Sequence, residues 1–387
     1  MTEMVQQEKT AVTRKLPRPG FDETRVEKLR RVADACSANG PFSIFIAQID
    51  PDAIGSAFGM QEVLSVMGHT AHIYYQGRVG HPQNEMLCSK LGLTSRMRPI
   101  PVPDEHGPPD VLVTNVVLVD SSKKKDSRLP FELNPVIVVD HHEKSDIKDS
   151  DDIFLWLDES AGSASTMVAE ILSEITPEKW EFKSDLALML ALGIYTDCKS
   201  NTRSGERDDQ AYAWVKRYTD NATLADLVNY KRKFSFLEHL ARAVAYVKKY
   251  DTYRKGRILA GLGRIPEKSG DDLAMVADEL LRTVGAPLAV TWAMVEVKSA
   301  DTGETTVKIR VCARSEDYTT NLGETLSARF GDKSGAKSLP DGSAEGGALF
   351  ELPGMGPWLK DDEMEEIVNR RIIEWFYDQK DTGTTDS

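Results

Sequence analysis

Pro135-Val136-Ile137-Val138-Val139 and the triplet Asp140-His141-His142 that follows it are the most informative part of this sequence. Four of the five residues before the triplet are apolar and β-branched, which predicts a buried strand. The triplet then falls where the strand ends, and ligands of open α/β sheets collect at the carboxyl ends of strands. A carboxylate beside two imidazoles can bind a divalent metal ion. A polar turn is the better explanation for one isolated triplet, so the rest of the chain decides.

Further acidic residues in the same half of the chain favour the metal. They follow predicted strands or a buried helix, and they are Asp50, Asp52, Asp120 and Asp197. Parallel strands place their carboxyl ends along one edge of a sheet, so we expect these side chains to meet. Carboxylates so close together repel one another unless cations lie between them. Oxygen ligands with some imidazole suit Mn²⁺ or Mg²⁺, and we expect one or two ions.

The composition indicates a soluble globular protein of two or three domains, because the chain has 387 residues, 41% hydrophobic and 28% charged. No apolar run approaches the roughly 20 residues that span a bilayer, and the polar N-terminus has no secretory signal. Four scattered cysteines indicate reduced thiols and a cytoplasmic location. The net charge of −13 argues against long duplex nucleic acid but allows short nucleotides, held by a few cations and metal ions.

The order of predicted elements indicates an α/β protein. We expect a flexible segment over 1–20, then a metal-binding domain over 21–220 with a parallel sheet and helices on both faces. A helical connector over 221–255 leads to a smaller α/β domain over 256–360. A helix and a polar tail occupy 361–387, where packing on the second domain is favoured over a homodimer contact. Within these domains, the apolar run 111–119 is predicted to be a strand, and Thr302-Gly303 is predicted to turn a hairpin.

Four segments of the first domain resemble, in order, the motifs of the DHH phosphoesterases. These are Asp50-Pro51-Asp52-Ala53-Ile54-Gly55-Ser56, Asp120, Asp140-His141-His142 and Gly193-Ile194-Tyr195-Thr196-Asp197. The resemblance covers roughly 40–205, and the spacing is similar to that of nanoRNases and cyclic-dinucleotide phosphodiesterases. It implies that Asp50 binds one metal ion, that Asp52 binds the second, and that Asp120 bridges the two. It also implies that His141 and Asp197 complete the second site, that His142 contacts the phosphate, and that Asp140 orients the two histidines.

Residues 225–360 resemble the DHH-associated C-terminal domain. Arg314-Ser315 stands where that domain places a substrate-binding arginine, and Lys337, Gly346 and Gly347 lie in two segments that could correspond to its glycine-rich loop. Two histidines of the family pattern are missing. The glycine-rich segments have none, and Ile46 occupies the position four residues before Asp50, with Gln48 as the nearest polar side chain.

The resemblance implies a metal-dependent phosphodiesterase that acts on short oligonucleotides, cyclic or linear dinucleotides, or nucleotide 3′,5′-bisphosphates. A metal-activated water would attack phosphorus, while Ser56, Arg203, Arg314 and Lys337 would help to hold the anionic substrate. An alternative is a weakly active or inactive relative that binds nucleotides as a sensor or scaffold. Inorganic pyrophosphatase is a third hypothesis. Arg203 and Arg207 are otherwise interpreted as solvated, unless their loop folds inward.

Overall fold

The computed structural model describes residues 23–101, 110–126, 128–142, 145–175, 181–298, 305–317, 321–331, 334–338, 343–351 and 361–377. These residues form two compact units. The first reaches Tyr230, and the second begins at Lys231 and includes Gly80–Pro82. The division separates the two helices that the sequence assigned to a connector, since α8 (Asn221–Val228) belongs to the first unit and α9 (Phe234–Tyr250) to the second.

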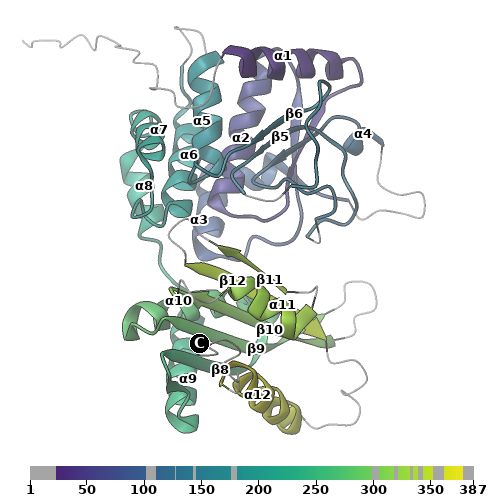
Figure 1. Cartoon of the computed structure of the whole chain (residues 1–387). Coiled ribbons are helices and arrows are strands. Elements are labelled where there is room, and N and C mark those ends of the chain that lie inside the picture. The colour runs from purple at the N-terminus through teal and green to yellow at the C-terminus, as the bar shows by residue number, and fades with distance from the viewer. Residues whose placement is uncertain are drawn as a thin grey trace, which may run out of the picture. The chain divides into compact units, whose positions relative to one another are not determined.

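A parallel sheet of six strands forms the centre of the first unit (Figure 1). Every neighbouring pair is parallel, and the order across the sheet is β3 (Met97–Pro99), β2 (Ala71–Tyr75), β1 (Phe42–Ile46), β4 (Val116–Val119), β5 (Pro135–Asp140) and β6 (Phe154–Leu157). All residues of β1 and β4 are buried, as expected for strands covered on both faces. The carboxyl ends of β1, β4 and β5 therefore lie side by side.

Helices cover one face of this sheet and mostly shorter segments cover the other. The helical face is packed by α1 (Glu23–Ser37), α2 (Pro51–Val66), α5 (Ala164–Ile175) and α6 (Ser184–Asp197). The opposite face is covered by the short helix α4 (Asp110–Val113) and by residues around Leu133 and Ile147. Besides α8, the unit also contains the helices α3 (Pro82–Leu91) and α7 (Glu206–Lys216) and the 3₁₀ turn η1 (Leu93–Ser95). The predicted α/β class is confirmed.

Only the second half of the apolar run 111–119 is a strand, so the prediction of a strand over the whole run is wrong for its first half. Residues Asp110–Val113 form α4, and β4 begins at Val116. Asn115 separates the two, because its side-chain amide donates to the carbonyls of Cys36 and Gly40 at 3.0 and 2.8 Å. Leu112 is buried against the second face of the sheet. Tertiary packing thus overrides the β preference of a valine-rich segment.

The second unit contains a mixed sheet. Its strands lie in the order β11 (Ser334–Ser338), β12 (Ala344–Glu351), β10 (Thr305–Ser315), β9 (Leu288–Lys298), β8 (Arg257–Pro266) and β7 (Tyr253–Arg254). Only β8 and β9 pair in parallel. The predicted turn at Thr302-Gly303 lies outside the described residues, but the strands on either side, β9 and β10, pair antiparallel.

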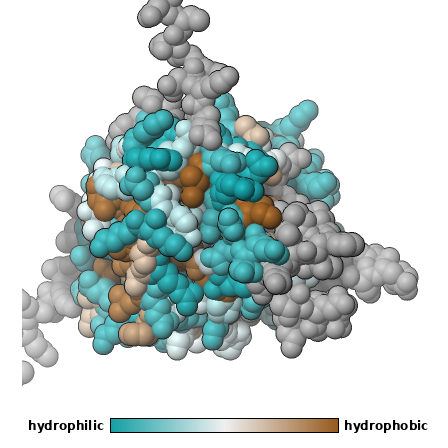
Figure 2. Space-filling view, turned by 90° about the horizontal axis from the view of Figure 1, so that it is seen from below, coloured by the Kyte–Doolittle hydropathy of each residue, from teal (hydrophilic) through white to brown (hydrophobic). Residues whose placement is uncertain are grey.

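Two pairs of helices sandwich this sheet. α9 and α10 (Asp272–Val284) pack on one face, and α11 (Leu322–Phe330) and α12 (Asp361–Tyr377) pack on the other. A 3₁₀ turn, η2 (Glu267–Ser269), precedes α10. Figure 2 shows apolar patches interspersed with hydrophilic side chains on the face seen from below. Among the residues that the structure describes, no helix has the length and apolar character needed to cross a membrane.

Candidate metal centre

The imidazole of His141 lies at the centre of three carboxylates. Its Nε2 is 3.3 Å from Oδ1 of Asp120, 3.4 Å from Oδ2 of Asp197 and 3.9 Å from Oδ2 of Asp52. Its Nδ1 faces the carbonyl of Ala161 at 3.3 Å, which fixes the tautomer with a lone pair on Nε2. A nitrogen lone pair and three carboxylate oxygens at such distances form a donor set that fits a hard divalent cation.

Metal-ligand geometry occurs twice in the described part of the chain, and His141 belongs to both groups. One group is Asp52, His141 and Asp197, and the other is Asp120, His141 and His142. Each brings its ligand atoms within 4.8 Å of one another. The fold thus brings together predicted ligands that follow β4 and β5, that begin α2 and that end α6. Asp50, the remaining predicted ligand, is in neither group.

Asp52 is fully buried in the first turn of α2 and is held by the N-terminus of α5. Its Oδ2 accepts from the amide of Ala164 at 2.8 Å, and its Oδ1 accepts from that of Ser165 at 2.7 Å. The positive end of the helix favours the carboxylate. Burial nevertheless raises the pKa of Asp52 to about 7, with further contributions from the charges of Asp197 and Asp120. A cation bound beside Asp52 would favour its ionised form.

Asp50 caps α2, because its Oδ1 accepts from the amide of Ala53 at 2.9 Å. Burial, and then the charges of Asp120 and Asp197, raise its pKa well above the usual range. Ser56, predicted to approach substrate, is fully buried, and its hydroxyl donates to the backbone carbonyl of Asp52 at 2.7 Å. In this structure Ser56 supports the first turn of α2.

Local backbone geometry places the other two carboxylates. Asp120 follows β4 with φ of 52°, in the left-handed region that aspartate tolerates better than most residues. This turn directs the chain away from the sheet at the point where the carboxylate is needed. Asp197 is the last residue of α6, where the helix carries partial negative charge. Both the side chain and the helix end therefore attract a cation.

Two glycines let the helices that carry Asp52 and Asp197 approach closely. A Cβ added at Gly193 of α6 would lie 2.4 Å from Oγ of Ser165 and 3.0 Å from Cα of Asp52. A Cβ at Gly55 of α2 would lie 2.7 Å from the carbonyl oxygen of Met189. Both positions leave no room for a methyl group. The close packing of α2, α5 and α6 thus sets the distance between the ligands.

His142 lies beside the carboxylate cluster and is oriented by Asp140. Its Nδ1 is 2.6 Å from Oδ1 of Asp140 and 3.6 Å from Oδ1 of Asp120. Burial would raise the pKa of Asp140, but the hydrogen bond and charge of His142 outweigh it, and the pKa is lowered. The side chain of His142 is one-third exposed, so the imidazole can reach a bound molecule. This geometry fits an imidazole held ready to contact an anion.

Arg128 is a charged residue of this region that the sequence analysis missed. Its Nε and Nη2 bond to the buried carboxylate of Asp126 at 2.9 and 2.6 Å, and its Nη1 donates to Oε1 of Gln48 at 3.2 Å. Gln48 stands two residues before Asp50. The residues lie 80 apart in sequence, and no motif spacing signals the contact. Ile46 is completely buried in the core and offers no ligand.

Arg207 is not solvated, so that interpretation is wrong. Arg207 lies in the first turn of α7, and its guanidinium is buried between Glu170 and Asp158. Its Nη2 donates to Oε2 of Glu170 at 2.6 Å, and its Nη1 donates to Oδ2 of Asp158 at 2.7 Å. It therefore ties α7 to α5. Arg203, predicted to hold phosphate, lies half-buried in the segment that follows α6.

The predicted substrate residues of the second unit lie in its sheet. Arg314 of β10 donates through Nε to Oδ1 of Asp278 at 2.8 Å, and its side chain is only 14% exposed. Ser315 ends the same strand and is buried. Lys337 is part of β11. The arginine therefore has an acidic partner on α10, within its own unit.

Gly346 and Gly347 belong to β12, which pairs with β10 and β11, rather than to a loop. A Cβ at Gly346 would lie 2.6 Å from Cδ1 of Leu326, and one at Gly347 would lie 2.8 Å from the carbonyl oxygen of Val311. The two glycines are thus required where α11 and β10 approach the strand. The expectation of a glycine-rich loop in this segment is wrong.

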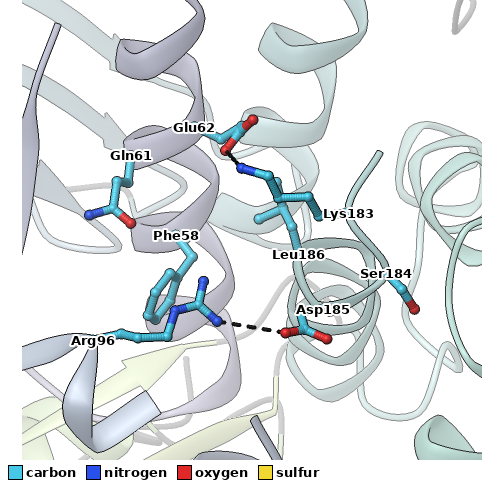
Figure 3. A pocket seen from close by; sticks show the side chains of 8 residues that line it. All are labelled: Phe58, Gln61, Glu62, Arg96, Lys183, Ser184, Asp185 and Leu186. Atoms are coloured by element: carbon cyan, nitrogen blue, oxygen red, sulfur yellow. Dashed lines mark hydrogen bonds and ion pairs between the residues drawn. The ribbon is translucent and has the colours of Figure 1, made fainter. Parts of the chain in front are cut away.

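A pocket of about 320 Å³ lies on the first unit, away from this chemistry (Figure 3). It is lined by residues from the middle of α2, such as Phe58, by the start of α6, and by Arg96 and Lys183 just outside helices. Asp52 lies at the start of α2 and Asp197 at the end of α6, away from this lining. Arg96 stacks over Phe58 at 4.6 Å and pairs with Asp185, while Lys183 pairs with Glu62. The cations here are matched by acids, and the pocket offers no metal-ligand group.

Comparison with known proteins finds a family match in the segment that carries most of the motifs. The DHH family, N-terminal domain, matches residues 43–194. An uncharacterized protein of Methanocaldococcus jannaschii, MJ1633, is 27% identical over 337 residues, 84% of this chain and 62% of that protein. The cyclic-di-AMP phosphodiesterase GdpP of Bacillus subtilis is 24% identical over 172 residues, 43% of this chain and 26% of that protein. The chain thus spans less than two thirds of the length of these relatives.

The fold also has a solved counterpart. The structure of an exopolyphosphatase-related protein from Bacteroides fragilis covers 92% of this chain and all of its own, with a TM-score of 0.62 and 13% identity. At this identity the likeness concerns the fold, which extends over both units. The segment that matches the DHH family, N-terminal domain, residues 43–194, contains His141 and nearly all of the parallel sheet.

Proposed function

We propose that this protein is a divalent-metal-dependent phosphoesterase that hydrolyses short nucleotide substrates. The observation that carries the proposal is Nε2 of His141, which faces carboxylates of Asp52, Asp120 and Asp197 within 3.9 Å. Mn²⁺ or Mg²⁺ suits this donor set. When bound, such an ion polarises a phosphoryl oxygen and lowers the pKa of water. The DHH family domain supports this class of chemistry.

The chain's own groups have separate roles in this proposal. Asp52, Asp120, His141 and Asp197 hold the ion, and Ala161 fixes the His141 tautomer through its carbonyl. His142, oriented by Asp140, contacts a phosphate oxygen and stabilises the negative charge that develops there. Its partial exposure allows this contact. Arg203, Arg314 and Lys337 remain candidates for other phosphate oxygens.

Short substrates are favoured over long duplexes. The net charge of −13 disfavours a polyanion that needs many cations along its length. The GdpP relative, which is similar to 43% of this chain, is named as a cyclic-di-AMP phosphodiesterase. We therefore propose cyclic or linear dinucleotides, oligonucleotides of a few residues and nucleotide 3′,5′-bisphosphates as the substrates to test.

The test is hydrolysis by the purified full chain with Mn²⁺ or Mg²⁺. Each substrate is incubated with wild-type protein and with Asp197→Asn, which removes one ligand charge at the end of α6. We expect metal-dependent hydrolysis of at least one substrate by the wild type and a loss of more than about 100-fold in the variant. Absence of turnover for all three substrate types, with the ion shown to be bound, would contradict the proposal.

A nucleotide-binding relative with little or no activity is the second candidate. It is favoured by Ile46, which is buried in the core where the family pattern has a metal-binding histidine, and by the pairing of Arg314 with Asp278. Calorimetry with cyclic dinucleotides separates the candidates. Tight binding without hydrolysis supports a sensor or scaffold, whereas hydrolysis at a measurable rate excludes it. Release of phosphate from pyrophosphate tests the remaining pyrophosphatase hypothesis.

A further inference from the structure

A chain of hydrogen bonds links the segment that carries Asp50 to the segment that carries Asp120. The hydroxyl of Ser121 donates to Oδ2 of Asp126 at 3.1 Å, and Asp126 holds two nitrogens of Arg128. The third nitrogen of the guanidinium donates to Gln48. Ser121 follows Asp120 directly, so this chain joins the two segments that carry Asp50 and Asp120. Arg128 is thereby fixed next to both segments.

The positive charge of Arg128 interacts with the carboxylates of Asp120 and Asp50. Burial alone would lower the pKa of Arg128, but the hydrogen bonds and charge of Asp126, followed by the charges of Asp120 and Asp50, raise it. An arginine carries its charge at every physiological pH, so it compensates negative charge permanently. Asp126 occupies the edge formed by Nε and Nη2, which leaves Nη1 directed to Gln48 on the Asp50 side. Arg128 is thus a preorganised cation at this flank.

The same flank lacks a ligand set for an ion. Both metal-ligand groups found among the described residues contain His141, and neither contains Asp50. One oxygen of Asp50 is engaged by the amide of Ala53, and Ile46 is buried in the core. A divalent ion in a protein site needs several ligands from the chain or from substrate. On the Asp50 side the carboxylate of Asp126 is already paired with the guanidinium of Arg128.

We propose that the centre holds one divalent ion, bound by His141 and the carboxylates around its Nε2. Arg128 supplies the positive charge on the Asp50 side, where a second ion would otherwise be needed. This inference rests on the metal centre of the proposed function but concerns its composition rather than its activity. In this proposal Arg128 acts through its charge and is not a metal ligand. The two hydrogen bonds to Asp126 hold the guanidinium in place, and its positive charge lowers the repulsion between Asp50 and Asp120.

The first test is the number of ions in the wild-type full chain. Mn²⁺ is titrated by calorimetry, and the metal content of the saturated protein is measured after gel filtration. We expect one Mn²⁺ per chain and the electron paramagnetic resonance spectrum of an isolated ion. Two ions per chain, or the spectrum of a coupled pair, would overturn the proposal. This readout needs no substrate and no variant.

The second test removes the charge of Arg128. Arg128→Gln keeps a donor for Gln48 and Asp126, while Arg31→Gln is the matched control, since Arg31 makes only a 3.9 Å pair with Asp151 and is 63% exposed. Loss of a nearby positive charge should tighten Mn²⁺ binding roughly fivefold to tenfold in Arg128→Gln and leave the control unchanged. Equal affinity in the two variants would overturn the role of Arg128.

Arg128→Lys separates charge from geometry. It keeps the cation but loses the two-nitrogen fork to Asp126. We expect one ion with an affinity within about twofold of wild type. Behaviour like that of Arg128→Gln would mean that the fork, and not the charge, matters, which contradicts the proposal. One bound ion without hydrolysis would count against the proposed enzyme only, whereas hydrolysis with two bound ions would count against this inference only.

Discussion

Acidic side chains are arranged differently in the two units of this protein. In the first unit Asp52, Asp120 and Asp197 face Nε2 of His141 within 3.9 Å, and the charges of Asp120 and Asp197 help to raise the pKa of Asp50. In the second unit the acids of α10 lie beside arginines of β10, as Arg314 does with Asp278 at 2.8 Å. Carboxylates gathered in this way attract a cation, whereas the acid and the arginine of the second unit satisfy each other.

The variant His141→Ala should have the largest effect on metal binding by the first unit. The variant removes the nitrogen shared by both ligand groups and leaves the carboxylates without a common partner. We expect Mn²⁺ affinity to fall by more than about 100-fold, beyond the usual effect of changing residues behind a ligand. Calorimetry measures the affinity, and circular dichroism checks the fold. Retained affinity would show that the ion binds elsewhere.

The second largest effect is expected in the pH dependence of stability, with and without bound metal. The pKa of Asp52 is raised to about 7, so the folded metal-free protein binds a proton that the unfolded chain releases near pH 4. Stability without metal therefore falls as pH rises from about 4 to 7, by up to about 4 kcal/mol. Added Mn²⁺ competes with that proton, so it should raise Tm more at pH 8 than at pH 5. Thermal unfolding at both pH values, with metal and with chelator, measures this. An equal rise would contradict the assignment.

Two glycines give a test within the backbone. Gly193→Ala should destabilise the first unit by about 1–3 kcal/mol and weaken Mn²⁺ binding, because a methyl group at that position overlaps Ser165. Gly346→Ala should cost a similar amount in the second unit, against Leu326, without a change in metal affinity. Gly335→Ala is the control, since no atom lies within 4 Å of its added Cβ. Denaturant unfolding and calorimetry report both quantities.

The smallest expected effect is that of Arg314→Gln. Its partner Asp278 is 37% exposed, so the pair is partly screened and its loss should cost below about 1 kcal/mol. Mn²⁺ affinity should stay unchanged. If the residue also holds substrate, as its resemblance implies, KM rises while the number of bound ions does not. An altered ion count would show that the two units do not act separately in metal binding.

Much of the first unit could be predicted because its signals are local. The apolar runs before Asp50 and Asp140 identify strands, and the carboxyl edge of a parallel sheet then gathers the polar residues that follow them. The residues that were misread depend on partners distant in sequence. The buried guanidinium of Arg207 on α7 is paired with Glu170 on α5, a residue 37 positions earlier in the sequence. The start of α4 in the run 111–119 depends on packing against the second face of the sheet.

The sequence alone determined the α/β class, the four ordered motifs and the types of ligand, because residue periodicity and side-chain chemistry are properties of short segments. Tertiary structure decided which of those ligands share an ion, since distances around His141 depend on how closely α2 and α6 pack at Gly55 and Gly193. It also placed Arg128 beside Gln48, a contact between residues 80 apart. Such contacts exist only after the chain has folded, so no local pattern encodes them.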